Sequence, residues 1–246
     1  QWVLPLLASM NYHRQHLSDA GIFMLLEGKR IVVTGGAGVL GAAVAAYAKQ
    51  QGAEVVLLDV IADFQSDLGE THTVDLTDEN SVRTCFSNVG SFDALANIAG
   101  GFDMGPAVYE TEDDVWDAMF NINVTTLRRV LSVATPLLLE RGRGSIVNVG
   151  ALGALRGTGN MGAYTAAKST VMRLTEALSD EVRHKGVNVN AVLPSLIDTP
   201  RNRADMPGAD FNTWVSPDDL AAVVCFLASD SARAVHGALV PVTGLV

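Results

Sequence analysis

Two residues with titratable side chains, Tyr164 and Lys168, stand four positions apart in the segment Tyr-Thr-Ala-Ala-Lys. This spacing places both side chains on one face of a helix. A free phenol has a pKa near ~10, which is too high for efficient acid–base catalysis at neutral pH. A nearby ammonium group such as that of Lys168 can lower a phenol pKa by about 1–3 units. The pair is therefore a candidate for proton transfer.

A glycine-rich run, residues 34–41, separates an apolar strand-like segment from a helical segment of small residues. Gly36, Gly38 and Gly41 fit the pattern G-x-G-x-x-G. Such glycines allow a tight turn, a close approach of the backbone to a pyrophosphate, and close packing of helix on strand. The helix that follows offers unpaired N–H groups and the positive end of its dipole to phosphates. The run predicts a dinucleotide site.

Asp59 ends the next strand-like segment, eighteen residues after Gly41. A carboxylate at this position can accept hydrogen bonds from both ribose hydroxyls and repels a 2′-phosphate. The sequence therefore predicts that NAD(H) is preferred to NADP(H).

The elements that must position these residues alternate along the chain. Strands are predicted at 30–34, 54–59, 71–75, 92–97, 144–149, 187–193 and 238–242. Helices are predicted at 39–51, 78–88, 112–140, 163–185 and 217–229. Repeated βα units of this kind predict an α/β fold of the Rossmann type, with a doubly wound, predominantly parallel seven-stranded sheet and helices on both faces. We expect an N-terminal extension over 1–23, one domain over 24–246, and a lid at about 200–216 because a long aperiodic segment in a compact domain is usually functional.

Composition narrows the classes of function. The 246 residues include 17 Lys and Arg against 27 Asp and Glu, a net charge of −10, and 48% of them are hydrophobic. An acidic chain is a poor candidate for binding nucleic acid, and the glycines within the uncharged stretch 31–48 argue against a membrane span. Two distant cysteines, Cys85 and Cys225, predict buried thiols in a reducing cytoplasm and no metal cluster.

Two further motifs complete a resemblance. Asn-Ile-Ala-Gly follows the fourth predicted strand at 97–100, and Pro194 to Thr199 follow the sixth. With the glycine turn and the Tyr–Lys pair, the chain resembles the short-chain dehydrogenase/reductase family over about residues 29–246. The resemblance implies that Tyr164 protonates or deprotonates the reacting oxygen while hydride moves to or from nicotinamide. It also implies that Lys168 holds the nicotinamide ribose and that Asn123 supports the proton relay.

The resemblance further implies a row of cofactor contacts. Within that row Asp75 would contact adenine, and Ile197 and Thr199 the carboxamide and phosphates. The complete set is Gly35, Gly36, Gly38, Val39, Leu40, Gly41, Asp59, Asp75, Leu76, Asn97, Ala99, Gly100, Tyr164, Lys168, Pro194, Ile197 and Thr199.

The chain departs from the family pattern at the catalytic serine, which usually lies thirteen residues before the tyrosine. Ala151 stands there, and loss of an oxyanion donor typically costs several kcal/mol in the transition state. Thr158 and Asn160 are possible replacements. This region and the lid resemble dihydropteridine reductase, a branch that lacks the serine and reduces a quinonoid ring with NADH.

Three hypotheses follow. The first is an NAD(H)-dependent oxidoreductase acting on a carbonyl or alcohol, the second a dihydropteridine reductase-like enzyme acting on a quinonoid substrate, and the third an inactive NAD(H)-binding sensor. The resemblance also implies a homo-oligomer, dimer or tetramer, formed through helices 112–140 and 163–185. Substrate contacts are expected from the following side chains: Phe102, Met104, Met161, Trp214, Arg201 and Arg203.

Overall fold

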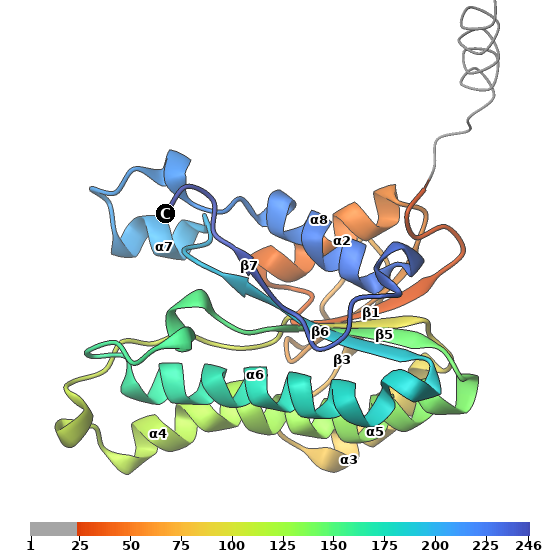
Figure 1. The fold of residues 1–246 in the computed structure, drawn as a ribbon, viewed down its shortest axis with the longest axis horizontal. Helices are drawn as coiled ribbons and strands as arrows, with labels where there is room; N and C mark the ends of the chain where they lie inside the picture. The colour runs from red at the N-terminus through yellow and green to blue at the C-terminus, as the bar shows by residue number, and fades with distance from the viewer. Residues whose placement is uncertain (1–23) are drawn as a thin grey trace, which may run out of the picture.

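Seven parallel strands, in the order β3-β2-β1-β4-β5-β6-β7, form the centre of the computed structural model, which describes residues 24–246 (Figure 1). The strands are β1 (Arg30–Thr34), β2 (Glu54–Asp59), β3 (Glu70–Thr73), β4 (Ala94–Asn97), β5 (Gly144–Val149), β6 (Val187–Pro194) and β7 (Leu239–Val242). The order reverses between β1 and β4, and ligands bind at such a switch point in doubly wound sheets. The predicted Rossmann-type fold is confirmed.

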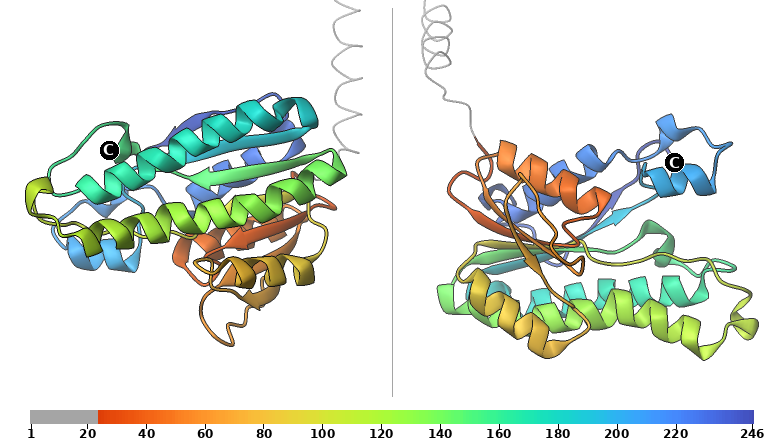
Figure 2. Two further views of the ribbon diagram at one scale, coloured as in Figure 1. Left: turned by 90° about the horizontal axis from the view of Figure 1, so that it is seen from below. Right: turned by 180° about the vertical axis from the view of Figure 1, so that it is seen from behind.

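Helices cover both faces of the sheet (Figures 1 and 2). On one face lie α2 (Val39–Gln50) and α8 (Pro217–Ala228), and on the other α3 (Glu79–Val89), α5 (Thr126–Arg141) and α6 (Gly162–Val182). Within β1, Ile31 and Val33 pack toward α2 while Val32 packs toward α3. Because the strands are buried on both faces, they read as continuous apolar runs without a polar alternation.

Two predicted segments differ in detail. The helix expected over 112–140 consists of α4 (Asp113–Phe120) and α5, joined by a π-helical turn (Asn121–Thr125). The segment 200–216, expected to be aperiodic, contains α7 (Pro200–Asp205) and a 3-10 turn (Phe211–Thr213). The short helix forms because the Thr199 hydroxyl accepts the N–H of Asn202 and Pro200 fits the first helical position. The extension predicted over 1–23 lies outside the described residues.

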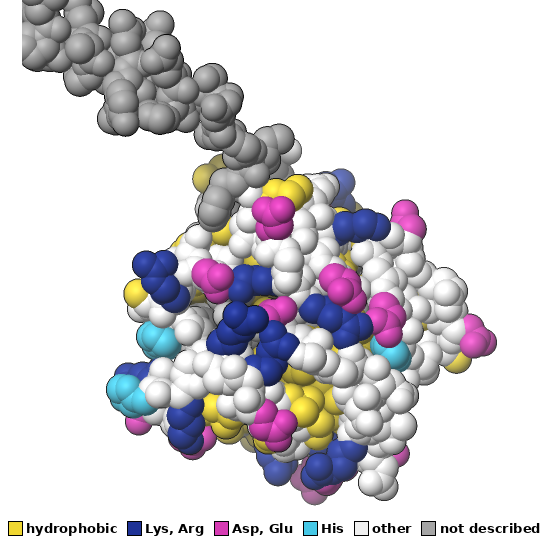
Figure 3. All heavy atoms as spheres, turned by 90° about the vertical axis from the view of Figure 1, so that its right-hand side faces the viewer, with side chains coloured by type: hydrophobic (Ala, Val, Ile, Leu, Met, Phe, Trp, Pro, Cys, Tyr) yellow, Lys and Arg dark blue, Asp and Glu magenta, His cyan; other side chains and the backbone are white. Residues whose placement is uncertain are grey.

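Basic side chains gather at the edge of the sheet where the strands begin and the helices end (Figure 3). Lys29, Arg143 and Arg233 line a hollow there together with the carboxylates of Asp93 and Asp230. Lys49 and Arg141 lie in the last turns of α2 and α5, where cations stabilise the negative ends of the helix dipoles. We call this face the basic edge. Between residues 24 and 246 the structure has no helix that is both long enough and apolar enough to cross a bilayer.

Candidate active site

The predicted site residues meet at the opposite edge, where β1, β4 and β5 end. Thr34, the last residue of β1, accepts hydrogen bonds at Oγ1 from the backbone N–H groups of Ile98 (3.1 Å) and Ala99 (3.2 Å). This contact ties the glycine turn after β1 to the segment after β4. The two loops on either side of the switch point therefore form one surface.

The glycine turn is packed so closely that side chains are excluded from two of its positions. A Cβ on Gly41 would lie 2.1 Å from the Gly35 oxygen, and one on Gly36 would lie 2.7 Å from Cδ2 of Leu57. A Cβ on Gly38 would meet only the Gly35 oxygen, at 3.3 Å. Gly38 caps α2 without a side-chain hydrogen bond, so the first N–H groups of the helix stay available to an anion. This cradle fits a pyrophosphate.

Two aspartates have carboxylates fixed by hydrogen bonds, Asp59 beside the glycine turn and Asp75 after β3. Asp59 accepts the N–H of Ala37 at Oδ2 (2.9 Å) and that of Ile61 at Oδ1 (3.2 Å). Asp75 accepts both the hydroxyl (2.6 Å) and the N–H (2.8 Å) of Thr77 at Oδ1. These hydrogen bonds from Thr77 lower the pKa of Asp75, so this exposed group is an anion at neutral pH.

Tyr164 and Lys168 lie one turn apart near the start of α6. Burial raises the pKa of Tyr164 to about 12, which is opposite to the direction predicted from its neighbour Lys168. Burial also lowers the pKa of Lys168 to about 8, and its Nζ donates to the Val149 oxygen at the end of β5 (2.9 Å). The prediction rested on the positive charges of Lys168 and of an oxidised nicotinamide, whereas loss of hydration is the effect that shifts both pKa values here.

Asn123 lies in the π-helical turn and holds the segment that follows β4. Its Nδ2 donates to the oxygens of Gly101 (3.0 Å) and Met119 (3.1 Å), and its Oδ1 accepts the N–H of Gly101 (3.1 Å). A Cβ on Gly100 would lie 2.9 Å from Oδ1 of Asn123 and 3.2 Å from Nζ of Lys168. Gly100 therefore lies between the Asn123 amide and the Lys168 ammonium, and a larger residue there would push these two groups apart. Isolated π turns of this kind are frequent at functional sites.

Ala151, at the position of the family serine, is buried with Met172 and Leu193, and Tyr164 packs against the same cluster. No hydroxyl is available from this position. Thr158 and Asn160 lie on an exposed segment, and the structure places neither side chain in a hydrogen bond. The Asn160 oxygen accepts the N–H of Gly105 (2.8 Å), which links the two loops that flank the tyrosine.

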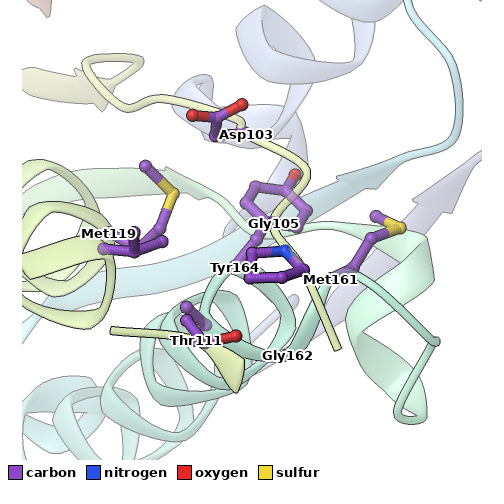
Figure 4. Close-up of a pocket in the computed structure, with 10 residues that line it drawn as sticks. Asp103, Gly105, Thr111, Met119, Met161, Gly162 and Tyr164 are labelled. Carbon is purple, nitrogen blue, oxygen red and sulfur yellow. The ribbon is translucent and has the colours of Figure 1, made fainter. Parts of the chain in front are cut away.

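A small pocket opens beside Tyr164 (Figure 4). Met161 lines it as predicted, and the Phe102 ring stands edge-on to the Tyr164 ring with centroids 4.8 Å apart. Trp214 is buried against Phe211 and is not among the lining residues. The full lining comprises Asp103, Gly105, Pro106, Thr111, Val115, Met119, Met161, Gly162, Ala163 and Tyr164.

Thr111, Val115 and Met119 also line the pocket, although the sequence did not lead us to expect them there. The signal was present, because Val115 and Met119 are four positions apart and share one face of a helix.

Comparison with known proteins addresses the family. A family model described as enoyl-(acyl carrier protein) reductase matches residues 35–244. A short-chain dehydrogenase of Penicillium rubens is 29% identical, and the alignment covers 89% of this chain and 96% of that protein. The chain belongs to the short-chain dehydrogenase/reductase family.

Solved structures of this family show both nicotinamide dinucleotides. A putative 2-deoxy-d-gluconate 3-dehydrogenase from Agrobacterium tumefaciens with bound NADP has a TM-score of 0.83 and 31% identity, covering 91% of this chain and 98% of that one. Carveol dehydrogenase from Mycobacterium avium in complex with NAD has a TM-score of 0.79 and 27% identity, covering 89% and 98%. The chain is thus a member of a family of nicotinamide-dependent oxidoreductases.

In this short-chain dehydrogenase/reductase, ion pairs hold the segment 200–216, where the sequence predicts a lid. The Arg203 guanidinium donates to both carboxylate oxygens of Asp198 and lies 4.8 Å from the centre of the Phe211 ring. Arg201 lies 3.7 Å from the Asp205 carboxylate. Arg201 and Arg203, for which substrate contact and a solvated surface were both open from the sequence, thus contact the carboxylates of Asp205 and Asp198.

Proposed function

We propose that this short-chain dehydrogenase/reductase transfers hydride between NAD(H) and a carbonyl or alcohol substrate, with Tyr164 as the general acid and base. The observation that carries the proposal is the position of Tyr164, which lines a pocket at the edge of the sheet where the strand order reverses. Lys168 lies one turn further along α6, and the glycine turn follows β1 at the same edge of the sheet. Bound nicotinamide would supply or accept the hydride. The protein supplies the proton and the orientation of the reactants.

Tyr164 holds its proton at neutral pH, as the general acid of a reduction must before the reaction begins. With a pKa of about 12 it is fully protonated, and a phenol donates when negative charge develops on the substrate oxygen. Lys168, with a pKa of about 8, is a cation at pH 7 and would stabilise the tyrosinate that forms. Reduction of a carbonyl is therefore favoured at neutral pH, and oxidation of an alcohol at alkaline pH.

Asn123 acts in this proposal as a positioning residue. Its three hydrogen bonds fix Gly101 and the π-helical turn, and through Gly100 they fix the space next to Nζ of Lys168. In this proposal, a proton that Tyr164 gives to the substrate would be replaced from the side of the site where Lys168 and Asn123 lie.

The preference for NAD(H) rests on Asp59. Its carboxylate is held beside the glycine turn by the N–H of Ala37, so it would meet a 2′-phosphate with like charge. The family itself includes structures with either dinucleotide, and the choice is therefore made by local residues such as this one.

Ala151 favours a second candidate substrate. A buried alanine gives no hydroxyl to polarise a ketone, whereas a quinonoid ring is already electrophilic and depends less on an oxyanion donor. Reduction of a quinonoid substrate by NADH is the second candidate function.

The decisive experiment follows NADH oxidation by absorbance with a panel of ketones and with quinonoid dihydropterin. Tyr164→Phe should reduce kcat by about 10²–10⁴-fold, since it removes the proton donor, and should leave NADH affinity within about twofold. Tyr109→Phe, at an exposed tyrosine, is the matched control. Turnover on ketones supports the first candidate and turnover on the pterin alone supports the second. NADH binding without turnover on any compound would favour the inactive sensor.

A further inference from the structure

The pocket beside Tyr164 has apolar walls and a single charged group. Pro106, Val115, Met119 and Met161 supply most of the wall, and the only acidic or basic side chain that lines it among the described residues is that of Asp103. Figure 4 shows Asp103 above the Tyr164 ring, on the side to which the phenol oxygen points. A substrate that reaches the phenol therefore passes a carboxylate and no cation.

The chain around this pocket is strongly acidic. Residues 101–120 contain no Lys, Arg or His. The carboxylates of this segment are exposed, and within residues 24–246 none of them lies in an ion pair. They belong to Asp103, Glu110, Glu112, Asp113, Asp114 and Asp117. Asp113 and Asp114 lie in the first turn of α4, where the helix dipole stabilises them but leaves their charge in place.

The cations near the pocket do not balance these carboxylates. Arg203 and Arg201 of the lid contact Asp198 and Asp205, as described above. Arg156, on the exposed segment before Tyr164, does not line the pocket. Many of the remaining basic side chains lie at the basic edge, at the far side of the sheet (Figure 3). The substrate opening is therefore a region of negative potential.

We propose that this site takes an uncharged, largely apolar carbonyl or alcohol compound, tolerates a cationic substituent and rejects anionic ones. Carboxylates, phosphate esters and acyl groups on coenzyme A or an acidic carrier protein fall in the rejected class. The proposal rests on the function proposed above and names its substrate class. Its physical basis is that an anion entering the pocket would exchange water for apolar walls and a like charge, with no cation among the described residues that line it.

The potential can be measured without knowing the substrate. Met161→Cys places a thiol in the pocket wall, and two thiosulfonates of similar size carry either a trimethylammonium or a sulfonate group. The thiolate attacks the sulfenyl sulfur, a disulfide forms and methanesulfinate leaves. Native Cys85 and Cys225 give little background, because burial raises their pKa values to about 11 and about 12. Labelling rates are read by mass spectrometry.

Ser87→Cys, at an exposed position on α3, is the control. We expect the ratio of cationic to anionic labelling rates to be at least about tenfold higher at position 161 than at position 87. The excess of this ratio at position 161 over position 87 should become smaller in 1 M salt, where the Debye length is about 3 Å, and also when Asp103→Asn is combined with Met161→Cys. Met104→Cys, on the loop of Asp103, repeats the measurement if Met161→Cys folds poorly. Equal ratios at both positions overturn the proposal.

A kinetic comparison then separates this inference from the proposed function. For a ketone that is turned over, a neutral keto ester should have kcat/KM at least about tenfold above that of the matching keto acid, and the gap should narrow in Asp103→Asn. Equal values for ester and acid overturn the charge selection while leaving the reductase function intact. Absence of turnover on every compound contradicts the proposed function, and the labelling ratio still decides the charge of the opening.

Discussion

Asn97 and Asn148 stand opposite each other on the parallel strands β4 and β5, and Nδ2 of Asn97 donates to Oδ1 of Asn148 at 2.8 Å. Both side chains are buried. Nδ2 of Asn148 in turn donates to the hydroxyl of Thr175 on α6 (2.9 Å). This chain of polar groups joins two strands of the switch-point edge to the helix that carries the tyrosine and the lysine, so it fixes the height of α6 over the sheet.

Asn148→Leu should therefore destabilise the protein by about 1–3 kcal/mol, because it leaves the buried amide of Asn97 without an acceptor. Urea unfolding measures the change. Asn88→Leu, at an exposed asparagine on α3, should stay within about 0.5 kcal/mol of the parent. If Asn148→Leu lowers the free energy of unfolding no more than Asn88→Leu does, the hydrogen bonds from Asn97 through Asn148 to Thr175 do not stabilise the position of α6.

Gly41→Ala and Gly38→Ala should separate folding from cofactor binding. The first places a methyl group 2.1 Å from the Gly35 oxygen and requires the turn to move, so we expect a loss of about 2 kcal/mol or more in the free energy of unfolding. The second meets backbone only at 3.3 Å and should change stability by less than about 1 kcal/mol while weakening NADH binding. Thermal melts and NADH titration test the two variants. Equal losses of stability would contradict the prediction that a side chain is excluded at Gly41 and tolerated at Gly38.

Lys168→Met should abolish turnover and yet stabilise the fold at pH 7. Burial lowers the pKa of Lys168 from 10.5 to about 8, so the folded protein holds its charge at a cost that the unfolded chain does not have. Removal of the charge should raise the free energy of unfolding by about 1–3 kcal/mol, reduced by loss of the hydrogen bond to Val149. Lys185→Met, at an exposed lysine, should have almost no effect.

The pH dependence gives a second readout for the same lysine. Between about pH 8 and pH 10.5 the unfolded chain binds more protons at this residue than the folded protein, so its contribution to stability rises with pH across that window. The stabilisation gained in Lys168→Met should therefore be largest below pH 8 and vanish by about pH 10.5. A gain that is independent of pH would mean that the methionine stabilises by packing alone.

Asp59→Asn should shift the cofactor preference. The amide oxygen can still accept the N–H of Ala37, which holds the glycine turn, while the negative charge and the hydrogen bond from the N–H of Ile61 are lost. We expect the ratio of KM for NADPH to KM for NADH to fall by about tenfold or more, since a full charge repulsion near the 2′-phosphate is removed. Asp63→Asn, in the loop that follows, has a backbone φ of 54° that asparagine tolerates, and it should leave the ratio unchanged.

The parts of the fold that depend on local pattern could be predicted from the sequence. The glycine turn and the strand that ends at Thr34 are defined by neighbouring residues, and the structure has β1 at the predicted bounds. The π-helical turn around Asn123 could not be predicted, because α4, the turn and α5 read as one continuous helix in sequence. Its position depends on contacts with Gly101, which lies 22 residues away.

The electrostatics of the site were the least predictable. Lys168 and Tyr164 were correctly expected to share a helix face, but the direction of the Tyr164 pKa shift depends on how deeply the neighbouring loops bury the phenol. Likewise Arg203 read as a substrate contact until the structure showed its guanidinium bound to Asp198 and stacked over Phe211. Pairings of this kind are set by tertiary packing and have no local signature.

The basic edge places Lys29, Arg143 and Arg233 on the side of the molecule opposite the acidic segment 101–120, although Asp93 and Asp230 line the same hollow and the chain as a whole carries −10. A negatively charged bead or electrode would be repelled least at the basic edge, and adsorption through that edge would leave the opening beside Tyr164 facing the bulk liquid. A positively charged support would bind the acidic end and obstruct that opening. The choice of resin alone thus decides whether an immobilised preparation of this protein stays accessible to small molecules.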